Sequence, residues 1–164
     1  MRSTHGILLT SMLMLHSTGF AQSAPPPDQR NQPLVEGRGQ YWSGDDVNRS
    51  LIAGAPVALP RTSTFFIAAQ NRTGEPQPPE AHTNRSQFYV VLDGSGVITV
   101  GGNVPNSTNT SPAERRGPAG QSIVGGTRYR VKSGDMLLIP KNTWHSAEPD
   151  SGGLRYVLVN FMEP

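Results

Sequence analysis

Two histidines, His82 and His145, are the residues whose chemistry and positions in this chain best suit a metal site. The chain contains 4 histidines. The other two, His5 and His16, lie in an N-terminal stretch that we expect to be removed from the mature protein. Neutral imidazole nitrogens are common ligands of transition-metal ions. The pair therefore predicts a site for a divalent metal ion, with Fe, Mn, Ni, Cu and Zn all compatible.

A neighbour of His82 can complete the ligand set. Glu80 stands two positions before it, and side chains two apart on an extended strand point to the same face. Two imidazoles and one carboxylate leave open positions on an octahedral ion, so Glu80 is either a metal ligand or a general base beside the metal.

The elements that must position these side chains are short strands. The chain has Gly 18 and Pro 15 in 164 residues, which is typical of strands joined by many turns. Glycine-containing pairs separate most of the runs that favour β structure, and this spacing predicts an antiparallel sandwich or barrel. The predicted strands cover residues 62–70, 87–92, 96–100, 121–124, 127–131, 135–140 and 154–161.

The first 21 residues have the features of a signal peptide. Arg2 supplies a positive charge, the following apolar run is too short to cross a bilayer as a helix, and Gly19 and Ala21 are small residues at the exit. We therefore expect a secreted or periplasmic protein that begins near residue 22 when mature, with no membrane-embedded part. Absent cysteines mean that this exported chain relies on an ordinary core instead of disulfides.

The rest of the chain is expected to form one domain with an N-terminal extension. Residues 22–33 are a proline-rich, polar leader that we predict to be disordered. Residues 34–60 are expected to form an arm with one short helix at 44–53, capped by Ser43, and residues 61–164 a barrel. Nearly equal numbers of basic and acidic residues, 14 and 12, give no basic surface for nucleic acid.

A long polar segment at residues 103–120 interrupts the regular spacing of the strands. It is rich in Asn, Ser, Thr, Pro and Gly, and connections of this length usually have a use in a compact domain. It is either a lid over the site or a mobile surface loop. If the segment folds inward, Arg115 and Arg116 are placed to bind a carboxylate; otherwise they face solvent.

Two spaced patterns in the chain resemble the motifs of the cupin superfamily. His82, Gln87 and Gly94 fit the pattern His-x4-[Glu/Gln]-x6-Gly. A second pattern, Gly-x5-Pro-x4-His, is fitted by Gly134, Pro140 and His145. The resemblance covers about residues 62–162 and is strongest to small single-domain bacterial cupins. It implies an all-β double-stranded β-helix, a jelly-roll barrel, preceded by the short N-terminal helix.

The chain departs from the cupin pattern at three positions. Glu80 replaces the first histidine of His-x-His, Gln87 replaces the usual glutamate ligand, and Asn142 replaces a turn glycine. Asn tolerates left-handed backbone angles, so the turn is expected to be kept. The resemblance makes Gln87 either a weak neutral ligand or a residue that hydrogen-bonds the ligands. An inward-facing Glu80, two residues before His82, would restore the negative charge lost at Gln87.

The resemblance implies two classes of function. In the first, the metal in the barrel mouth supports oxygenase, isomerase or lyase chemistry on a small organic substrate. In the second, a barrel with a degenerate metal site binds a small molecule such as a sugar without catalysis, or serves dimerisation. Cupins often pair through strand edges or N-terminal segments, which also implies a homodimer for this chain.

Overall fold

The computed structural model describes residues 41–53 and 62–163. The predicted signal peptide, the proline-rich leader and parts of the predicted arm lie outside these residues. Within the described part, no helix combines the length and the apolar character that crossing a bilayer requires.

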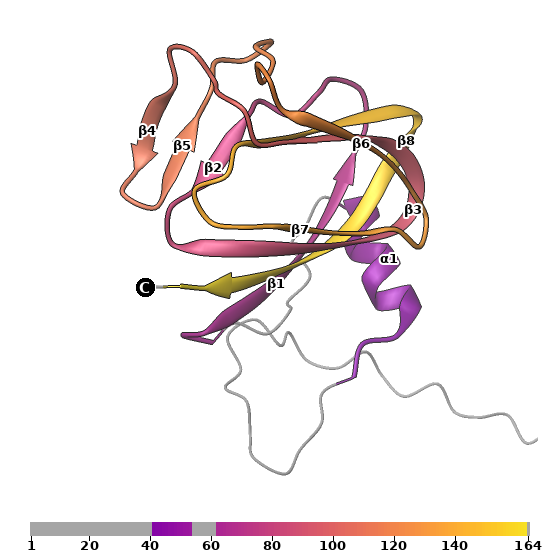
Figure 1. Cartoon of the computed structure of the whole chain (residues 1–164). Coiled ribbons are helices and arrows are strands. Elements are labelled where there is room, and N and C mark those ends of the chain that lie inside the picture. Colours follow the sequence, from indigo (N-terminus) through magenta and orange to yellow (C-terminus); the bar gives the residue numbers. More distant parts are fainter. Residues whose placement is uncertain (1–40, 54–61, 164) are drawn as a thin grey trace, which may run out of the picture.

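Strands make up most of the described chain, and one short helix precedes them (Figure 1). All strand pairings are antiparallel and join the strands into one sheet, with β4, β5, β2, β8, β3 and β6 as successive neighbours. β1 pairs with β8, and β7 with β3. The elements are α1 (Gly44–Ala53), β1 (Phe65–Arg72), β2 (Glu80–His82), β3 (Arg85–Val100), β4 (Thr108–Ser111), β5 (Glu114–Arg116), β6 (Thr127–Lys132), β7 (Met136–Ile139) and β8 (His145–Met162).

The two longest strands, β3 and β8, pair along most of their length and organise the sheet. Their register shifts between Val91 and Asp93 and again between Gly94 and Gly96. Such irregularities bend a strand and increase its twist. Figure 1 shows both strands curving around the same side of the molecule. β3 joins the predicted strands 87–92 and 96–100 into one, and β8 begins nine residues before the predicted strand 154–161.

Side chains that alternate along these strands form the core. On β8, Leu154, Tyr156 and Leu158 are buried at every second position, and Asn160 continues the same face. Each Å² of apolar surface that is buried on this face stabilises the fold by about 25 cal/mol. The main core cluster consists of Tyr89, Val91, Ile98, Val131, Ile139, Ala147, Leu154, Tyr156 and Leu158. The buried face thus changes from apolar to polar toward the end that carries the site.

Helix α1 confirms the predicted helix at 44–53. Ser43 caps it, because its hydroxyl accepts a hydrogen bond from the amide of Asp46 at 3.1 Å. The Asp46 carboxylate in turn accepts a hydrogen bond from the Ser43 amide at 3.2 Å. This reciprocal arrangement satisfies amides that a helix N-terminus otherwise leaves without partners.

Two expectations about the segment between β3 and β6 were wrong. Residues 121–124 do not form a strand: Val124 makes only one backbone bridge, with Asn103, and Gly125 turns away at φ 74°. Residues 103–120 are not a plain loop either. They contain the hairpin of β4 and β5, and β5 joins the sheet beside β2. Without β5, one edge of β2 would have unpaired backbone groups. β5 forms as a strand because it supplies the partners that an irregular loop could not.

Candidate metal centre

Neighbouring strands bring Glu80, His82 and His145 together. Glu80 and His82 stand at the two ends of β2 and point to the same side, as their spacing predicted. His145 begins β8 and lies directly opposite Glu80 in the β2–β8 pairing. The cupin patterns thus bring residues 63 positions apart, at 82 and 145, to a single site.

The ligand atoms of these three residues converge on one point. The Oε1 atom of Glu80 lies 3.5 Å from Nε2 of His82 and 3.4 Å from Nε2 of His145. All three ligand atoms lie within 4.8 Å of one another. Ligands bound at about 2.0–2.2 Å from one ion are separated by roughly 3–3.5 Å, so the donor set fits a divalent cation with little movement. The three residues could therefore hold a metal ion.

The ring of His145 is oriented for ligation by its own turn. Its Nδ1 atom lies 3.1 Å from the carbonyl oxygen of Thr143 and donates a hydrogen bond to it, which leaves the lone pair on Nε2. Among the described residues, Nε2 is buried without a hydrogen-bond partner. Asn142 makes the preceding turn with φ 61°, as predicted for an asparagine in place of glycine, and its amide donates to the carbonyl of His82. The turn at residues 142–143 therefore contacts both histidines, through the backbone of His82 and the ring of His145.

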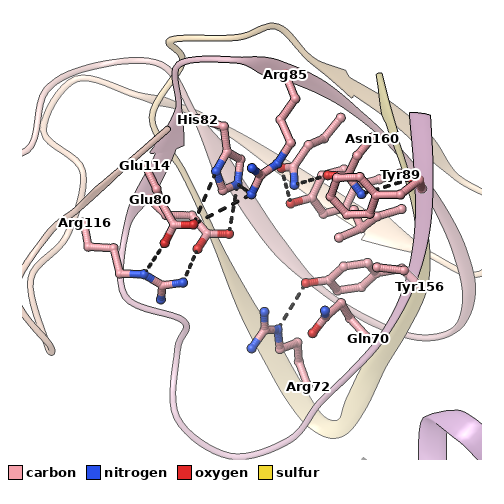
Figure 2. Close-up of a pocket in the computed structure, with 14 residues that line it drawn as sticks. Gln70, Arg72, Glu80, His82, Arg85, Tyr89, Glu114, Arg116, Tyr156 and Asn160 are labelled. Carbon is pink, nitrogen blue, oxygen red and sulfur yellow. Dashed lines mark hydrogen bonds and ion pairs between the residues drawn. The ribbon is translucent and has the colours of Figure 1, made fainter. Parts of the chain in front are cut away.

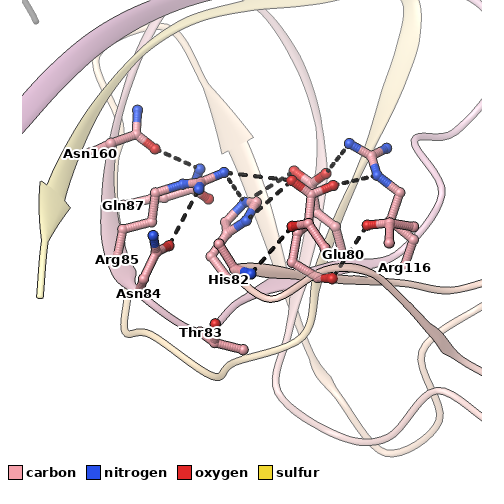
Figure 3. Close-up of polar contacts among 12 residues, drawn as sticks. Glu80, His82, Thr83, Asn84, Arg85, Gln87, Arg116 and Asn160 are labelled. Carbon is pink, nitrogen blue, oxygen red and sulfur yellow. Dashed lines mark hydrogen bonds and ion pairs between the residues drawn. The ribbon is translucent and has the colours of Figure 1, made fainter. Parts of the chain in front are cut away.

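His82 is held between groups of opposite charge (Figure 3). Its Nδ1 atom lies 3.7 Å from a carboxylate oxygen of Glu114, and Nη2 of Arg85 lies 3.4 Å from its Nε2. Burial is the main reason why the pKa of His82 is lowered; Glu80 opposes this effect and Arg85 adds to it. The imidazole is therefore neutral near pH 7, which is the form that binds metals.

Glu80 remains ionised despite its burial. Its Oε2 atom pairs with Arg116 at 3.1 Å, while Oε1 faces the two histidines. Burial acts to raise the pKa of Glu80, but the contacts with His145 and His82 outweigh it and hold the pKa well below the usual range. A carboxylate with one oxygen on an arginine and the other toward two imidazoles suits metal ligation.

Gln87 belongs to a cross-strand amide pair. It lies opposite Asn160 in the β3–β8 pairing, and its Nε2 atom donates a hydrogen bond to the Asn160 side chain at 2.9 Å. The hydroxyl of Tyr89 donates to the Gln87 carbonyl oxygen at 3.4 Å. These bonds join Gln87 to Asn160 and Tyr89, neither of which belongs to the Glu80, His82 and His145 cluster. Both predicted roles of Gln87, as a weak ligand and as a residue that hydrogen-bonds the ligands, therefore stay predictions.

The cluster opens into a cavity of about 190 Å³ (Figure 2). Tyr89 and Tyr156 form part of its wall, and burial raises the pKa of both hydroxyls, so they keep their protons at neutral pH. The lining residues are Phe66, Ala68, Gln70, Arg72, Glu80, His82, Arg85, Gln87, Tyr89, Glu114, Arg116, Tyr156, Leu158 and Asn160.

The β4–β5 hairpin contributes residues to this site. Arg116 lies between Glu80 and Glu114, consistent with the prediction that it would bind a carboxylate if the segment folded inward. Arg115 points the other way, with its guanidinium 5.0 Å from the centre of the Trp144 ring. Sequence reasoning missed Glu114, Asn160 and Arg72. Only the alternation along β5 and β8 could have indicated the first two, and only once those strands were known.

Glu114 is expected to position His82 for metal binding. When Nε2 of His82 binds an ion, Nδ1 carries the proton. The Glu114 carboxylate lies 3.7 Å from Nδ1, and a small shift that brings it within hydrogen-bonding distance would hold the ring in place. Glu114→Gln should therefore weaken metal affinity by about 10- to 100-fold. Competition titration with a chelating dye would measure this, with Glu148→Gln on the exposed Arg128 pair as the matched control. Equal affinities for the two variants would show that Glu114 does not position the histidine.

Comparisons with known proteins agree with this fold. A sequence model of the AraC-like ligand binding domain matches residues 119–164. The chain is 29% identical over 149 residues to dimethylsulfoniopropionate lyase DddW of Ruegeria pomeroyi, covering 90% of this chain and 80% of the relative. A conserved Klebsiella pneumoniae protein with a double-stranded β-helix domain superposes with a TM-score of 0.51 at 13% identity, covering 76% of this chain and 90% of that one. The chain therefore has the double-stranded β-helix of the cupin fold.

Proposed function

We propose that this protein is a metal-dependent lyase that acts on a small organic substrate. The observation that carries the proposal is the convergence of the two Nε2 atoms of His82 and His145 on Oε1 of Glu80, beside a small cavity that Glu80 and His82 line. Of the three chemistries considered from the sequence, lyase chemistry has support from a relative, because DddW is named a lyase.

The substrate of that relative suggests the reaction to test. Elimination from dimethylsulfoniopropionate moves a proton from the carbon next to the carboxylate to hydroxide from the solvent, which becomes water. The carbon–sulfur bond breaks, and its electron pair leaves with dimethyl sulfide. The other product is acrylate. A divalent ion held by Glu80, His82 and His145 would supply Lewis-acid stabilisation of negative charge.

The chain's own residues provide the rest of the environment. Glu80 serves as a ligand in this proposal, because Oε1 is shared by the two imidazoles and Oε2 is held by Arg116. The hydroxyl of Tyr156, which accepts a hydrogen bond from Arg72 and keeps its own proton, offers a neutral donor toward the substrate. The buried rings of Tyr89 and Tyr156 form part of the cavity wall beside the reacting atoms.

A headspace assay for dimethyl sulfide tests the proposal. Protein loaded in turn with Fe, Mn, Ni, Cu or Zn would be incubated with dimethylsulfoniopropionate near neutral pH. We expect release with at least one metal, loss of release after chelation, and a fall of at least about 100-fold in His145→Ala, which removes one ligand. Release no faster than in protein-free buffer with every metal would overturn the assignment of this substrate.

Ligand binding without turnover is the second candidate function. It is favoured by the match of residues 119–164 to the AraC-like ligand binding domain. Under this alternative, the cavity binds a small molecule that is recovered unchanged, and removing the metal leaves the affinity for that molecule the same. Secretion or periplasmic export and homodimer formation remain part of the proposal as predictions from the sequence.

A further inference from the structure

One wall of the cavity presents hydrogen-bond donors that the metal cluster does not use. Gln70 and Arg72 stand two apart on β1 and both line the cavity. Tyr156 lies directly opposite Gln70 in the β1–β8 pairing. Figure 2 shows the three side chains gathered on the side of the cavity away from Arg85 and Asn160.

Arg72 is fixed in place by one edge of its guanidinium. Its Nε atom donates a hydrogen bond to the Tyr156 hydroxyl at 3.1 Å. Within residues 41–53 and 62–163, this is its one polar contact, so Nη1 and Nη2 carry donors with no acceptor. A guanidinium held at Nε and open at both Nη atoms is pre-organised for a planar group with two oxygen atoms.

Tyr156 adds a further donor at the same place. Its hydroxyl accepts from Arg72, and because burial raises the pKa of Tyr156, the hydroxyl keeps a proton that it can donate. The ring is fully buried, which fixes the position of the hydroxyl. In the described part of the chain, the amide of Gln70 likewise has no hydrogen-bond partner, so its N–H groups are available to a ligand.

The balance of charge in the cavity favours an anion at this wall. Three arginines line the cavity, against the two carboxylates Glu80 and Glu114. Arg116 pairs with both carboxylates, whereas Arg72 pairs with neither. Binding a divalent cation to the cluster would make the cavity more positive still. An anionic group is therefore the natural complement of the donors around Arg72.

We propose that Arg72, Tyr156 and Gln70 form a carboxylate-binding subsite in the wall of this cavity. The ligand class is a small monocarboxylate, because the whole cavity measures about 190 Å³. This inference deepens the proposed function, on which it rests for the reaction, by placing the substrate carboxylate on Arg72 and the adjacent carbon toward the metal cluster. Arg72 and Tyr156 would then stabilise the negative charge that grows on the carboxylate as the neighbouring proton leaves.

Calorimetric titration of the chelator-treated full-length protein with propionate tests the subsite without the metal. Arg72→Met is expected to weaken propionate binding by about 10- to 100-fold, as for a lost charge-assisted hydrogen-bond pair. Arg72→Lys keeps the charge but loses the planar fork, and Tyr156→Phe keeps the ring but loses the hydroxyl. Each of these should weaken binding several-fold, by roughly the worth of one hydrogen bond.

Two controls separate recognition from folding and from charge. Propionamide, a neutral probe of similar shape, should bind weakly and equally to the wild type and all three variants. Arg128→Met removes one charge from an exposed pair with Glu148, away from the cavity, and should leave propionate affinity unchanged. If Arg72→Met fails to fold, Arg72→Lys and Tyr156→Phe, checked by thermal unfolding, give the same comparison.

The outcomes distinguish this inference from the proposed function. No measurable propionate binding to the wild type, or binding unchanged in Arg72→Lys and Tyr156→Phe, would overturn the subsite even if the protein takes up metal and releases dimethyl sulfide. Propionate binding that depends on Arg72, in a protein that never binds metal, would support the subsite and refute the lyase.

Discussion

Replacing Glu80 by glutamine is expected to lower the affinity for a divalent metal ion by more than about 100-fold, more than is usual for a residue that only supports a ligand. The substitution keeps the shape of the side chain but removes the one negative charge that faces both Nε2 atoms. An amide oxygen is a weaker, neutral ligand. If Glu80 compensates for the glutamine at position 87, this residue should matter most after the two histidines.

Competition titration with a chelating dye would give the affinities of wild type, Glu80→Gln and two controls. Glu148→Gln makes the same chemical change in an exposed ion pair and should leave the affinity unchanged. Arg116→Met removes the partner of Oε2 but keeps the carboxylate, and should cost about tenfold, as for a supporting residue. A Glu80→Gln affinity within threefold of the wild type would show that the carboxylate is not a ligand.

Gly94→Ala is expected to destabilise the protein by more than about 3 kcal/mol, among the larger effects of single substitutions. Gly94 has φ +78°, which costs a residue with a Cβ atom about 1–2 kcal/mol. The added Cβ would also lie 2.1 Å from the carbonyl oxygen of Gly153 on β8. Backbone cannot move aside there without disturbing the β3–β8 pairing at the bulge.

Urea unfolding of Gly94→Ala and Gly134→Ala would separate the two contributions. Gly134 has φ +88°, but in the described part of the chain no atom lies within 4 Å of an added Cβ. Its substitution should therefore cost only the conformational term, about 1–2 kcal/mol. Similar losses of unfolding free energy for both variants would mean that the close approach of β3 and β8 at Gly94 is not needed for stability.

The parts of the site that lie close in sequence to a motif could be predicted. Glu80 and His82 share a face because a two-residue spacing on a strand allows no other result, and Pro78 and Pro79 favour an extended approach. The turn before His145 was predictable too, because asparagine is one of the few residues that adopt φ 61° easily. Local backbone preferences fix these features.

Residues that reach the site through long-range strand pairing could not be predicted. Glu114 comes to His82 because β5 pairs with β2, and Asn160 meets Gln87 because of the β3–β8 register. Neither pairing is encoded in the residues near Glu114 or Asn160; each depends on how the whole sheet closes. The sequence of residues 103–120 was interpreted as a polar loop because β4 is exposed and neither β4 nor β5 has an alternation of apolar residues.

The altered motif gains a physical explanation from the structure. Gln87 stands where the cupin pattern usually has a glutamate, carries no charge and pairs with Asn160. Glu80 on β2 supplies the carboxylate instead. Arg116 and Glu114, from the β4–β5 hairpin, then support that carboxylate and the neighbouring His82. The hairpin therefore belongs to the site, which neither the lid nor the surface-loop interpretation of this segment described in full.

Elemental analysis of the purified protein tests the central claim most directly. Wild type and the double variant His82→Ala/His145→Ala would be purified identically and their metal-to-protein ratios measured by mass spectrometry of the elements. The proposed site requires close to one divalent transition-metal ion per chain in the wild type and almost none in the double variant. A wild type without stoichiometric metal after supplementation, or a double variant that retains all of it, would contradict the assignment of Glu80, His82 and His145 as a metal centre.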